Sequence, residues 1–450
     1  MALYAYLKER MMEHPDARLE DEHESIRYDT LIERAETLGK TLTKDKYGLL
    51  CKSELYTATA LLACLYAEKT AVPLSLRYGE RHVSKIVEAA GLSWILTDSG
   101  AEQIAQEEKS ADDLHDTALI MYTSGTTGTP KGAMISPKNI WVNLADIESY
   151  FHIYSGDTIL ISRPLYHCAV LTGELLIALI KGLNIVFYNE GFNPVRVLHV
   201  IRNKGIDVIG GTPTLFYHLC SMARDRVVPL KTAAISGECM TTTVARKIRA
   251  VMPDTRIYNV YGLTEASPRI SFLPCEQFDR HPTSVGITLR SVQARIVDGE
   301  LLVRGMNIMR GYYRQPEATE KALAGGWLHT GDMAEADSNG YLYIHGRRDD
   351  MIIRGGMNIY PQEIENAVKQ DDRILDVMVW GARDGRVGQK INIMAVAPGV
   401  EESELLQICR ARLPGYQLPD HAQLVSALPR NGSGKLLRPR DCREGAYAAV

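Results

Sequence analysis

Short apolar runs alternate with amphipathic segments through the middle of the chain. The apolar runs have the length of buried strands and lie at 117–124, 157–162, 184–189, 206–212 and 231–237. The amphipathic segment 193–205 begins at Asn193 with Pro194 in its first turn, as helices often do. Residues 174–182 have a helical pattern and end at Gly182, a typical helix C-cap. This alternation predicts βαβ units and a mostly parallel sheet.

The pattern changes after about residue 285. Residues 293–305 predict a β-hairpin with its turn at Asp298-Gly299. A stretch dense in glycine and charge follows, and then a mixture of strand-like and helix-like patterns. We therefore expect an α/β protein with a large N-terminal domain of βαβ-rich subdomains, residues 1–348, and a small α+β C-terminal domain, residues 349–450.

The composition is that of a globular protein and argues against two functional classes. Of the 450 residues, 45% are hydrophobic and 24% are charged, and the formal net charge of −4 gives no general electrostatic basis for binding nucleic acid. The most apolar stretch, residues 171–188, is interrupted by Glu174, Lys181 and Gly182. We expect a helix followed by a strand there rather than a membrane span.

The cysteine pattern and the first residues of the sequence indicate the cellular compartment in which the protein acts. The 8 cysteines are scattered and form no CxxC pair, which argues against a zinc site. Scattered cysteines in a large chain are typical of a reducing compartment. The first residues have no signal-peptide pattern, so we expect a cytoplasmic protein.

A glycine- and threonine-rich stretch, MYTSGTTGTPKGAM, occupies residues 121–134. Glycines let several backbone N–H groups point inward and hydroxyls add donors, so such a loop suits a phosphate. Its order differs from the Walker A pattern, which has four residues between Gly and Gly-Lys-Ser/Thr. From these residues alone, a solvated linker and a phosphate-binding loop are both open.

Other motifs, in a fixed order, favour the phosphate-binding loop. The set comprises TSGTTGTPKG (123–132), NVYGLTE (259–265), WLHTGD (327–332), GRRDDMIIRGGMNIYPQEIE (346–365) and LPRNGSGKLLR (428–438). Together they resemble the signatures of the adenylate-forming superfamily, which includes acyl- and aryl-CoA synthetases, firefly luciferase and nonribosomal adenylation domains. The resemblance runs from about residue 117 to 440.

The resemblance implies a reaction in two steps. A carboxylate attacks the α-phosphate of ATP, which gives an acyl-adenylate and pyrophosphate, and a thiol then displaces AMP. Carboxylate and phosphate repel each other, so the first step needs cations and oriented donors. The expected cofactors are ATP, Mg²⁺ and coenzyme A, and the expected substrate is a small carboxylic acid.

The resemblance also assigns the contacts to ATP. Those to the phosphates are Thr123, Ser124, Gly125, Thr126, Thr127 and Gly128, with Lys131 assisting. Those to adenosine are Gly237, Glu238, Asn259, Tyr261 and Gly262, with Arg347 supporting the ribose or a phosphate. Asp332 suits the ribose because one carboxylate can accept hydrogen bonds from both hydroxyls.

Three residues are assigned by the resemblance to the chemistry at phosphorus. Glu265 would hold Mg²⁺, because one carboxylate with phosphate oxygens is a usual arrangement for that ion. Thr264 would contact the α-phosphate. Lys435 is the catalytic candidate, because a mobile ammonium can reach both the carboxylate and the α-phosphate. Taken singly, Glu265 would be an ordinary surface carboxylate, so the joint pattern carries these assignments.

The segment RPLYHCAVLTGE, residues 163–174, resembles a segment of acyl- and aryl-CoA ligases. Amino-acid adenylation domains tend to carry Asp at the position of His167, where it pairs with the substrate ammonium. An unpaired ammonium in an apolar pocket is costly, so we expect a plain carboxylic acid. Gly210, Gly211 and Thr212 would line the pocket with His167, and their small side chains suit an aliphatic or aryl acid.

The resemblance places a hinge at Asp349, and Gly355 and Gly356 would line the path of the thiol. We expect the tail to rotate as a unit between the two steps. Three functions are open: an acid–CoA ligase, an adenylating enzyme that loads a carrier protein, and an inactive nucleotide- or acyl-binding protein. The presence of Glu265, Asp332 and Lys435 favours an enzyme, and a monomer and a homodimer are both open.

Overall fold

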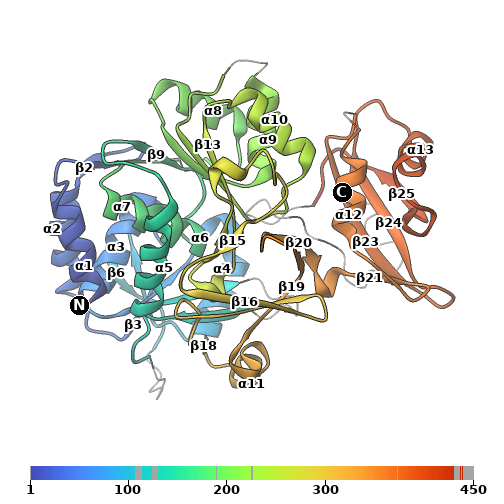
Figure 1. Cartoon of the computed structure of the whole chain (residues 1–450). Helices are drawn as coiled ribbons and strands as arrows, with labels where there is room; N and C mark the ends of the chain where they lie inside the picture. The colour runs from blue at the N-terminus through green and yellow to red at the C-terminus, as the bar shows by residue number, and fades with distance from the viewer. Residues whose placement is uncertain are drawn as a thin grey trace. The chain divides into compact units, whose positions relative to one another are not determined.

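The computed structural model describes residues 2–106, 114–123, 130–188, 190–223, 227–371 and 373–429, with Leu436 and Arg438 (Figure 1). The chain forms two compact units. Unit 1 comprises Met1–Met240, Val244–Arg295 and Leu302–Thr330, and unit 2 comprises Thr241–Thr243, Ile296–Leu301 and Gly331–Val450. The expected boundary at residue 349 stays a prediction.

A nine-stranded sheet in unit 1 has the order β15-β14-β13-β12-β11-β9-β10-β1-β2. Its strands are β1 (Arg18–Glu20), β2 (Ser25–Arg27), β9 (Thr158–Ile161), β10 (Asn184–Phe187), β11 (Val208–Gly211), β12 (Thr232–Ile235), β13 (Arg256–Gly262), β14 (Arg269–Phe272) and β15 (Ile287–Thr288). All neighbouring pairs from β1 to β13 are parallel, while β2, β14 and β15 pair antiparallel. The predicted parallel sheet is therefore present.

A seven-stranded sheet, also in unit 1, has the order β18-β8-β7-β4-β3-β5-β6. Its strands are β3 (Lys46–Leu49), β4 (Thr70–Pro73), β5 (Trp94–Thr97), β6 (Gly100–Gln103), β7 (Leu119–Thr123), β8 (Lys131–Ile135) and β18 (Gly311–Tyr312). The glycine- and threonine-rich stretch joins β7 to β8, which pair antiparallel with Thr123 opposite Lys131. This stretch therefore connects two strands of a hairpin, whereas a Walker A loop leads from a strand into a helix.

The helices begin and end largely where the local sequence signals lie. They are α1 (Leu3–Met12), α2 (Tyr28–Gly39), α3 (Glu54–Tyr66), α4 (Glu80–Ala90), α5 (Pro137–Tyr150), α6 (Cys168–Val170), α7 (Ile177–Lys181), α8 (Pro194–Asn203), α9 (Pro213–Ala223), α10 (Thr242–Val251), α11 (Pro316–Ala322), α12 (Pro361–Val368) and α13 (Glu402–Arg412). The Asn193 side chain accepts a hydrogen bond from the backbone N–H of Arg196 at 3.2 Å, which confirms the predicted cap of α8. Gly182 ends α7 in the left-handed conformation, as expected.

Between α6 and α7 lies a wide π-helical turn, η2 (Leu171–Leu176). The predicted helix over 174–182 therefore begins inside this turn and continues as α7, and β10 follows it. The apolar stretch 171–188 is thus a helix followed by a strand, as its interrupting residues indicate. Across the described ranges, no helix has both the length and the apolar character needed to cross a membrane.

A four-stranded sheet has the order β16-β17-β19-β20, and the division between the two units runs through its strands. The strands are β16 (Val292–Val297), β17 (Glu300–Gly305), β19 (Leu328–Ala336) and β20 (Leu342–Arg347). Asp298 and Gly299, between β16 and β17, have φ of 50° and 78°. Two successive positive φ values are typical of the tight hairpin turn that the Asp-Gly pair predicts.

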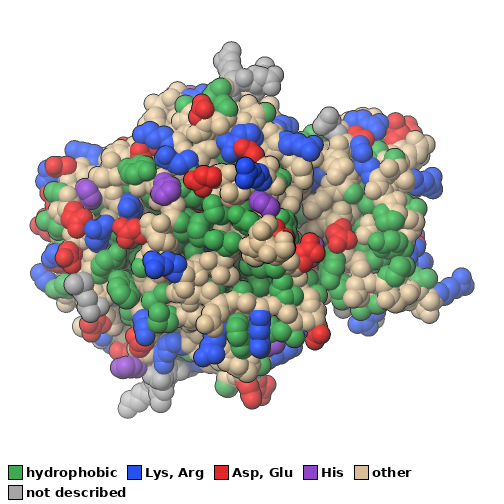
Figure 2. All heavy atoms as spheres, in the orientation of Figure 1, with side chains coloured by type: hydrophobic (Ala, Val, Ile, Leu, Met, Phe, Trp, Pro, Cys, Tyr) green, Lys and Arg blue, Asp and Glu red, His purple; other side chains and the backbone are tan. Residues whose placement is uncertain are grey.

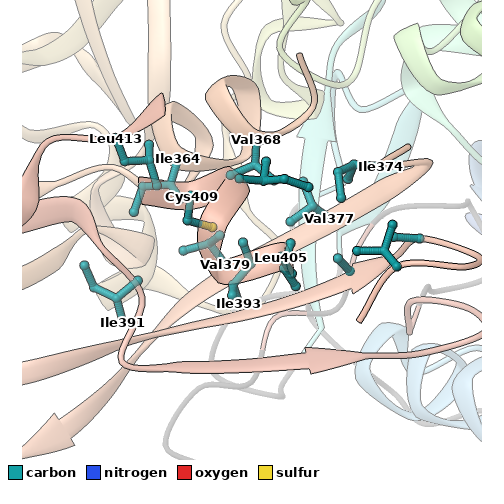
Figure 3. Packing of buried hydrophobic residues seen from close by; sticks show 14 of the residues in the cluster. Ile364, Val368, Ile374, Val377, Val379, Ile391, Ile393, Leu405, Cys409 and Leu413 are labelled. Carbon is teal, nitrogen blue, oxygen red and sulfur yellow. The ribbon is translucent and has the colours of Figure 1, made fainter. Parts of the chain in front are cut away.

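The rest of unit 2 has its own core. A two-stranded hairpin, β21 (Ile352–Arg354) and β22 (Met357–Ile359), is followed by a three-stranded sheet of β23 (Asp376–Asp384), β24 (Gly388–Val396) and β25 (His421–Leu424). Ile364 of α12, Val379 of β23, Ile393 of β24 and Cys409 of α13 belong to one buried cluster, in which helices cover the sheet (Figure 3). Segments up to 45 residues apart in sequence therefore bury a common apolar core.

Charged side chains are mixed on the surface. Figure 2 shows acidic and basic side chains interspersed over the visible face. This distribution agrees with the small net charge of −4 and with the absence of a general basic character expected from the sequence.

In unit 2, Arg438 forms an ion pair with Glu365 of α12, and both side chains form hydrogen bonds with the backbone of Val379. Its Nη2 lies 2.7 Å from both carboxylate oxygens of Glu365, and its Nε donates to the carbonyl of Val379 at 3.2 Å. The same carboxylate accepts from the backbone N–H of Val379 at 2.8 Å. The exposed fractions of the two side chains are 14% for Arg438 and 8% for Glu365, so this is a buried ion pair.

We expect Arg438→Met to destabilise unit 2, because it leaves the buried Glu365 carboxylate without its cation. Removing one partner of a buried pair costs about 3–5 kcal/mol. Hydrogen exchange in the full chain should accelerate in α12 and β23. Arg373→Met is the matched control, because Arg373 pairs with Asp371 at 2.9 Å with 53% of its side chain exposed. Equal protection of α12 and β23 in both variants would contradict the structural role of Arg438.

Candidate active site

Most of the predicted site residues of unit 1 lie where parallel strands end. His167 follows β9, Gly210 and Gly211 end β11 with Thr212 behind them, Gly237 and Glu238 follow β12, and Thr264 and Glu265 follow β13. These strands are neighbours in the order β13-β12-β11-β9. The carboxyl ends of adjacent parallel strands meet at one edge of the sheet, which is where open α/β sheets bind ligands. The sheet topology therefore brings these residues together.

The turn after β12 is tied to the segment after β11. The Glu238 carboxylate accepts hydrogen bonds from the backbone N–H of Thr214 at 3.2 Å and from its hydroxyl at 2.6 Å. Gly237 has φ of 92°, which side chains rarely adopt, and a Cβ there would lie 3.6 Å from the Thr212 side chain. The assigned nucleotide residues Gly237 and Glu238 are thus held beside the assigned substrate residue Thr212.

The end of β13 carries the predicted adenine contacts. Asn259 is buried and its amide donates to the carbonyl of Ser284 at 2.7 Å, so part of its hydrogen-bonding capacity is used within the protein. The pairing with β14 shifts between Tyr261 and Gly262. At Gly262 a side chain would collide with the carbonyl of Pro268, so this bulge requires glycine. The adenine contacts themselves stay predictions.

Glu265 lies on a short 3-10 turn, η3 (Thr264–Ala266), directly after β13. Its Oε1 accepts a hydrogen bond from the Tyr312 hydroxyl at 2.8 Å, and its backbone carbonyl accepts from the N–H of Met309 at 2.8 Å. Within the described part of the chain, no basic side chain forms an ion pair with Glu265. A carboxylate that is held by a neutral donor and has no cationic partner fits Mg²⁺ bound through one protein oxygen and phosphate oxygens.

His167 is held as a neutral imidazole. Burial lowers its pKa to about 3, and the charges of Arg163 and Arg77 act in the same direction. Its neighbour Tyr166 donates its hydroxyl to the carbonyl of Tyr122 at 3.0 Å. Tyr122 belongs to β7, the strand that leads into the glycine- and threonine-rich stretch. The segment that carries His167 is thus connected to the strand before that stretch.

Glu54, near the start of α3, is a residue that the sequence analysis did not identify. Its Oε2 accepts a hydrogen bond from the backbone N–H of Leu165 at 3.2 Å, two residues before His167. Burial raises the pKa of the Glu54 carboxyl to about 7, and the nearby Arg77 charge opposes that rise. In the sequence Glu54 is an ordinary acidic residue in a first helical turn, so no local signal points to this contact.

A buried ion pair lies beside the predicted acid pocket. The Arg163 guanidinium pairs with the carboxylate of Glu174, whose side chain is 3% exposed. A side chain at Gly210 would collide with this carboxylate, so the pair lies against the backbone of β11. The sequence predicts that small or apolar residues line the acid pocket. The Arg163–Glu174 ion pair beside the pocket was not part of that prediction. The sequence feature that could have indicated this ion pair is Glu174, a charged residue inside the most apolar stretch of the chain.

Asp332 and Arg347, both in unit 2, face each other across β19 and β20. The Arg347 Nε lies 3.0 Å from Asp332 Oδ1, and Asp332 is buried. The structure thus brings together two residues that the sequence assigned to the ribose. Asp349 lies in the short turn η6 (Arg348–Asp350), and the pair Gly355-Gly356 forms the turn between β21 and β22. Their roles as hinge and thiol path stay predictions.

Part of the predicted site lies outside the described residues. This part comprises Ser124, Gly125, Thr126, Thr127, Gly128 and Lys435. The flanking residues are described: the Thr123 hydroxyl donates to the carbonyl of Lys131 at 3.5 Å. The Lys131 ammonium lies 5.3 Å from the ring centre of Tyr312, the residue that contacts Glu265.

Known proteins match the sequence of this chain over most of its length. The family model of the AMP-binding enzyme matches residues 7–313, and that of the AMP-binding enzyme C-terminal domain matches residues 363–435. A feruloyl-CoA synthase from Amycolatopsis sp is 31% identical over 416 residues, which are 84% of each chain. A 2-succinylbenzoate–CoA ligase from Bacillus cytotoxicus is 28% identical over 98% of each chain.

Solved structures share the fold. The o-succinylbenzoate CoA synthetase from Bacillus subtilis in complex with the acyl-adenylate intermediate superposes with a TM-score of 0.84, at 27% identity and 96% coverage of each chain. The same enzyme has also been solved in complex with ATP and a magnesium ion, and that structure also gives a TM-score of 0.84. The order of motifs, the edge of the parallel sheet and both family models agree, and the chain belongs to the family of AMP-binding, adenylate-forming enzymes.

Proposed function

We propose that the protein is an AMP-forming acid–CoA ligase that acts on a plain aliphatic or aryl carboxylic acid. The observation that carries this proposal is the meeting of His167, Thr212, Glu238 and Glu265 at the carboxyl edge of one parallel sheet. In this proposal the same edge carries the acid pocket, the nucleotide-binding turn and the carboxylate that binds the metal. The relatives reported above are CoA ligases, which supports CoA as the acceptor.

The charges at the pocket support a substrate without an ammonium group. His167 is neutral, so it offers no anion to an amino acid. The carboxylate of Glu174 is already paired with Arg163. Transfer of an unpaired ammonium into such a site would be costly, whereas a plain acid brings only the carboxylate that reacts.

In the mechanism we propose, the residues of the chain bind and orient the substrates. Mg²⁺, when bound, offsets the negative charge of the phosphates. Glu265 holds that ion, and the Thr264 hydroxyl contacts the α-phosphate. His167 adds no negative charge beside the attacking carboxylate. Lys435 neutralises the charge that develops as the carboxylate bonds to phosphorus and pyrophosphate leaves.

Residues of unit 2 bind the ribose of the nucleotide in this proposal. The Asp332 carboxylate accepts hydrogen bonds from the ribose hydroxyls, and Arg347 orients it. The thiolate of coenzyme A then attacks the acyl carbon, and AMP leaves. The described cysteines are free thiols, which supports action in a reducing compartment such as the cytoplasm.

The direct test is ATP–pyrophosphate exchange over a panel of carboxylic acids, followed by product analysis with CoA. We expect exchange with one class of plain acid and conversion of that acid to its CoA thioester. Exchange only with amino acids would contradict the substrate class. Transfer to a phosphopantetheine carrier protein but not to CoA would favour the carrier-loading enzyme, and no exchange with any acid would favour an inactive binding protein.

Lys435→Ala should reduce adenylate formation by tens to thousands of fold, because one electrostatic contact in the transition state is lost. Thioester formation from a supplied acyl-adenylate should be largely retained. The two half-reactions are measured separately. Lys390→Ala is the control, since Lys390 pairs with Asp384 at 3.1 Å on the surface of the same unit. Equal loss in both half-reactions with an intact fold would show that Lys435 does not act in adenylation.

His167→Asp should lower kcat/KM for the best acid, because it places an anion beside the carboxylate that reacts. His167→Gln is the matched variant, because it keeps a neutral polar side chain and should lose less activity. Steady-state kinetics of pyrophosphate exchange gives both values. An unchanged kcat/KM in His167→Asp would place this residue outside the acid pocket.

Asp349→Pro should change the two half-reactions to different extents, because proline fixes φ near −65° and would hold the tail in one orientation. Which step is slowed depends on the orientation that proline favours. Asp349→Ala removes the same carboxylate but leaves the backbone free, so it should affect both steps less. Small, equal effects of proline on adenylation and thioester formation would exclude a hinge at Asp349.

A further inference from the structure

A short segment of unit 1, Met309–Tyr313, connects the two parts of the site that handle phosphate. We call it the strap. Its Arg310 and Tyr313 N–H groups donate to the carbonyls of Met134 and Gly132 in β8, at 2.9 and 2.8 Å. At its other end Met309 donates to the carbonyl of Glu265 at 2.8 Å. The strap thus joins the strand that leaves the glycine- and threonine-rich stretch to the turn that carries Glu265.

The Tyr312 side chain makes a second connection between the same two places. Its hydroxyl lies 2.8 Å from Glu265 Oε1, and its ring centre lies 5.3 Å from the Lys131 ammonium. The first contact is a hydrogen bond to a carboxylate, and the second is within the range of a cation–π interaction. Tyr312 itself is buried, with 9% of the residue exposed, whereas Glu265 and Lys131 are half-buried.

The strap is itself held in place. The Tyr312 N–H donates to the Thr319 hydroxyl of α11 at 2.8 Å. Gly311 has φ of 151°, and a side chain there would lie 2.5 Å from the methyl group of Thr319. The amide of Gln315 donates to the carbonyl of Pro130 at 3.0 Å, directly before β8. The position of the Tyr312 ring is therefore set by β8 and α11 together.

We infer that Tyr312 is a positioning residue for the metal carboxylate, and that it couples Glu265 to Lys131 at the start of β8. This inference rests on the proposed role of Glu265 in holding Mg²⁺. A neutral hydroxyl orients one oxygen of the carboxylate without cancelling its charge. An arginine or lysine in this place would pair with Glu265 and compete with the ion.

The two contacts of Tyr312 can be separated by substitution. Tyr312→Phe removes the hydroxyl and keeps the ring, so the hydrogen bond to Glu265 is lost while the ring contact with Lys131 is kept. Tyr312→Leu removes the hydroxyl and the ring, so the contact with Lys131 is lost as well. Loss of a residue that orients a metal ligand typically weakens metal affinity by about 10–100-fold.

The test measures Mn²⁺ binding to the protein with a non-hydrolysable ATP analogue, by electron paramagnetic resonance, in place of Mg²⁺. We expect Tyr312→Phe to weaken Mn²⁺ about 10–100-fold while the affinity for the analogue without metal stays unchanged. Tyr312→Leu should in addition lower the affinity of the protein for the ATP analogue without metal. Tyr313→Phe is the matched control, because the Tyr313 hydroxyl accepts from Lys46 at 2.5 Å and lies on the neighbouring position of the same strap.

A double-mutant cycle with Glu265→Gln decides whether Tyr312 acts through Glu265. We expect Tyr312→Phe to have little further effect on Mn²⁺ affinity once Glu265 is changed. The same loss in both backgrounds would overturn the inference, as would equal losses in Tyr312→Phe and Tyr313→Phe. Weakened Mn²⁺ binding in Tyr312→Phe, together with no exchange activity of the native protein on any acid, would support the positioning role and refute the ligase function.

Discussion

Parallel pairing of β9, β11, β12 and β13 is the constraint on which the site depends. Each of these strands is buried along most of its length, and such strands need cover on both faces, so helices connect them. The connecting helices return the chain to the same end of the sheet each time. The residues that follow the strands therefore gather at one edge, although His167 and Glu265 lie 98 positions apart in the sequence.

The site also depends on which charges are cancelled and which are not. Arg163 cancels Glu174 beside the pocket, and burial keeps His167 neutral. Glu265 is held instead by the neutral hydroxyl of Tyr312. A carboxylate without a cationic partner attracts a cation more strongly than a paired one, and this difference supports the proposed role of Glu265 as the metal ligand.

Features with a local signal could be predicted from the sequence, and features made by distant contacts could not. The cap at Asn193, the stop at Gly182 and the turn at Asp298-Gly299 each depend on neighbouring residues. Tyr312 reaches Glu265 across 47 positions, and Glu54 reaches Leu165 across 111. Only the folded chain brings such partners together, so neither Tyr312 nor Glu54 has a recognisable pattern around it. The motifs fixed the candidate residues, while the sheet topology explains why they meet.

The opposite shifts of Glu54 and His167 have a consequence for unfolding. The pKa of Glu54 rises from 4.5 to about 7, so between these values the native carboxyl holds a proton that the unfolded chain releases. The pKa of His167 falls from 6.5 to about 3. Between these two pH values the imidazole is protonated in the unfolded chain and neutral in the native protein. Acidification from pH 6.5 to 4.5 thus stabilises the fold through Glu54 and destabilises it through His167. The two groups therefore act in opposite directions on the stability of unit 1 as the pH falls, and each offsets part of the effect of the other.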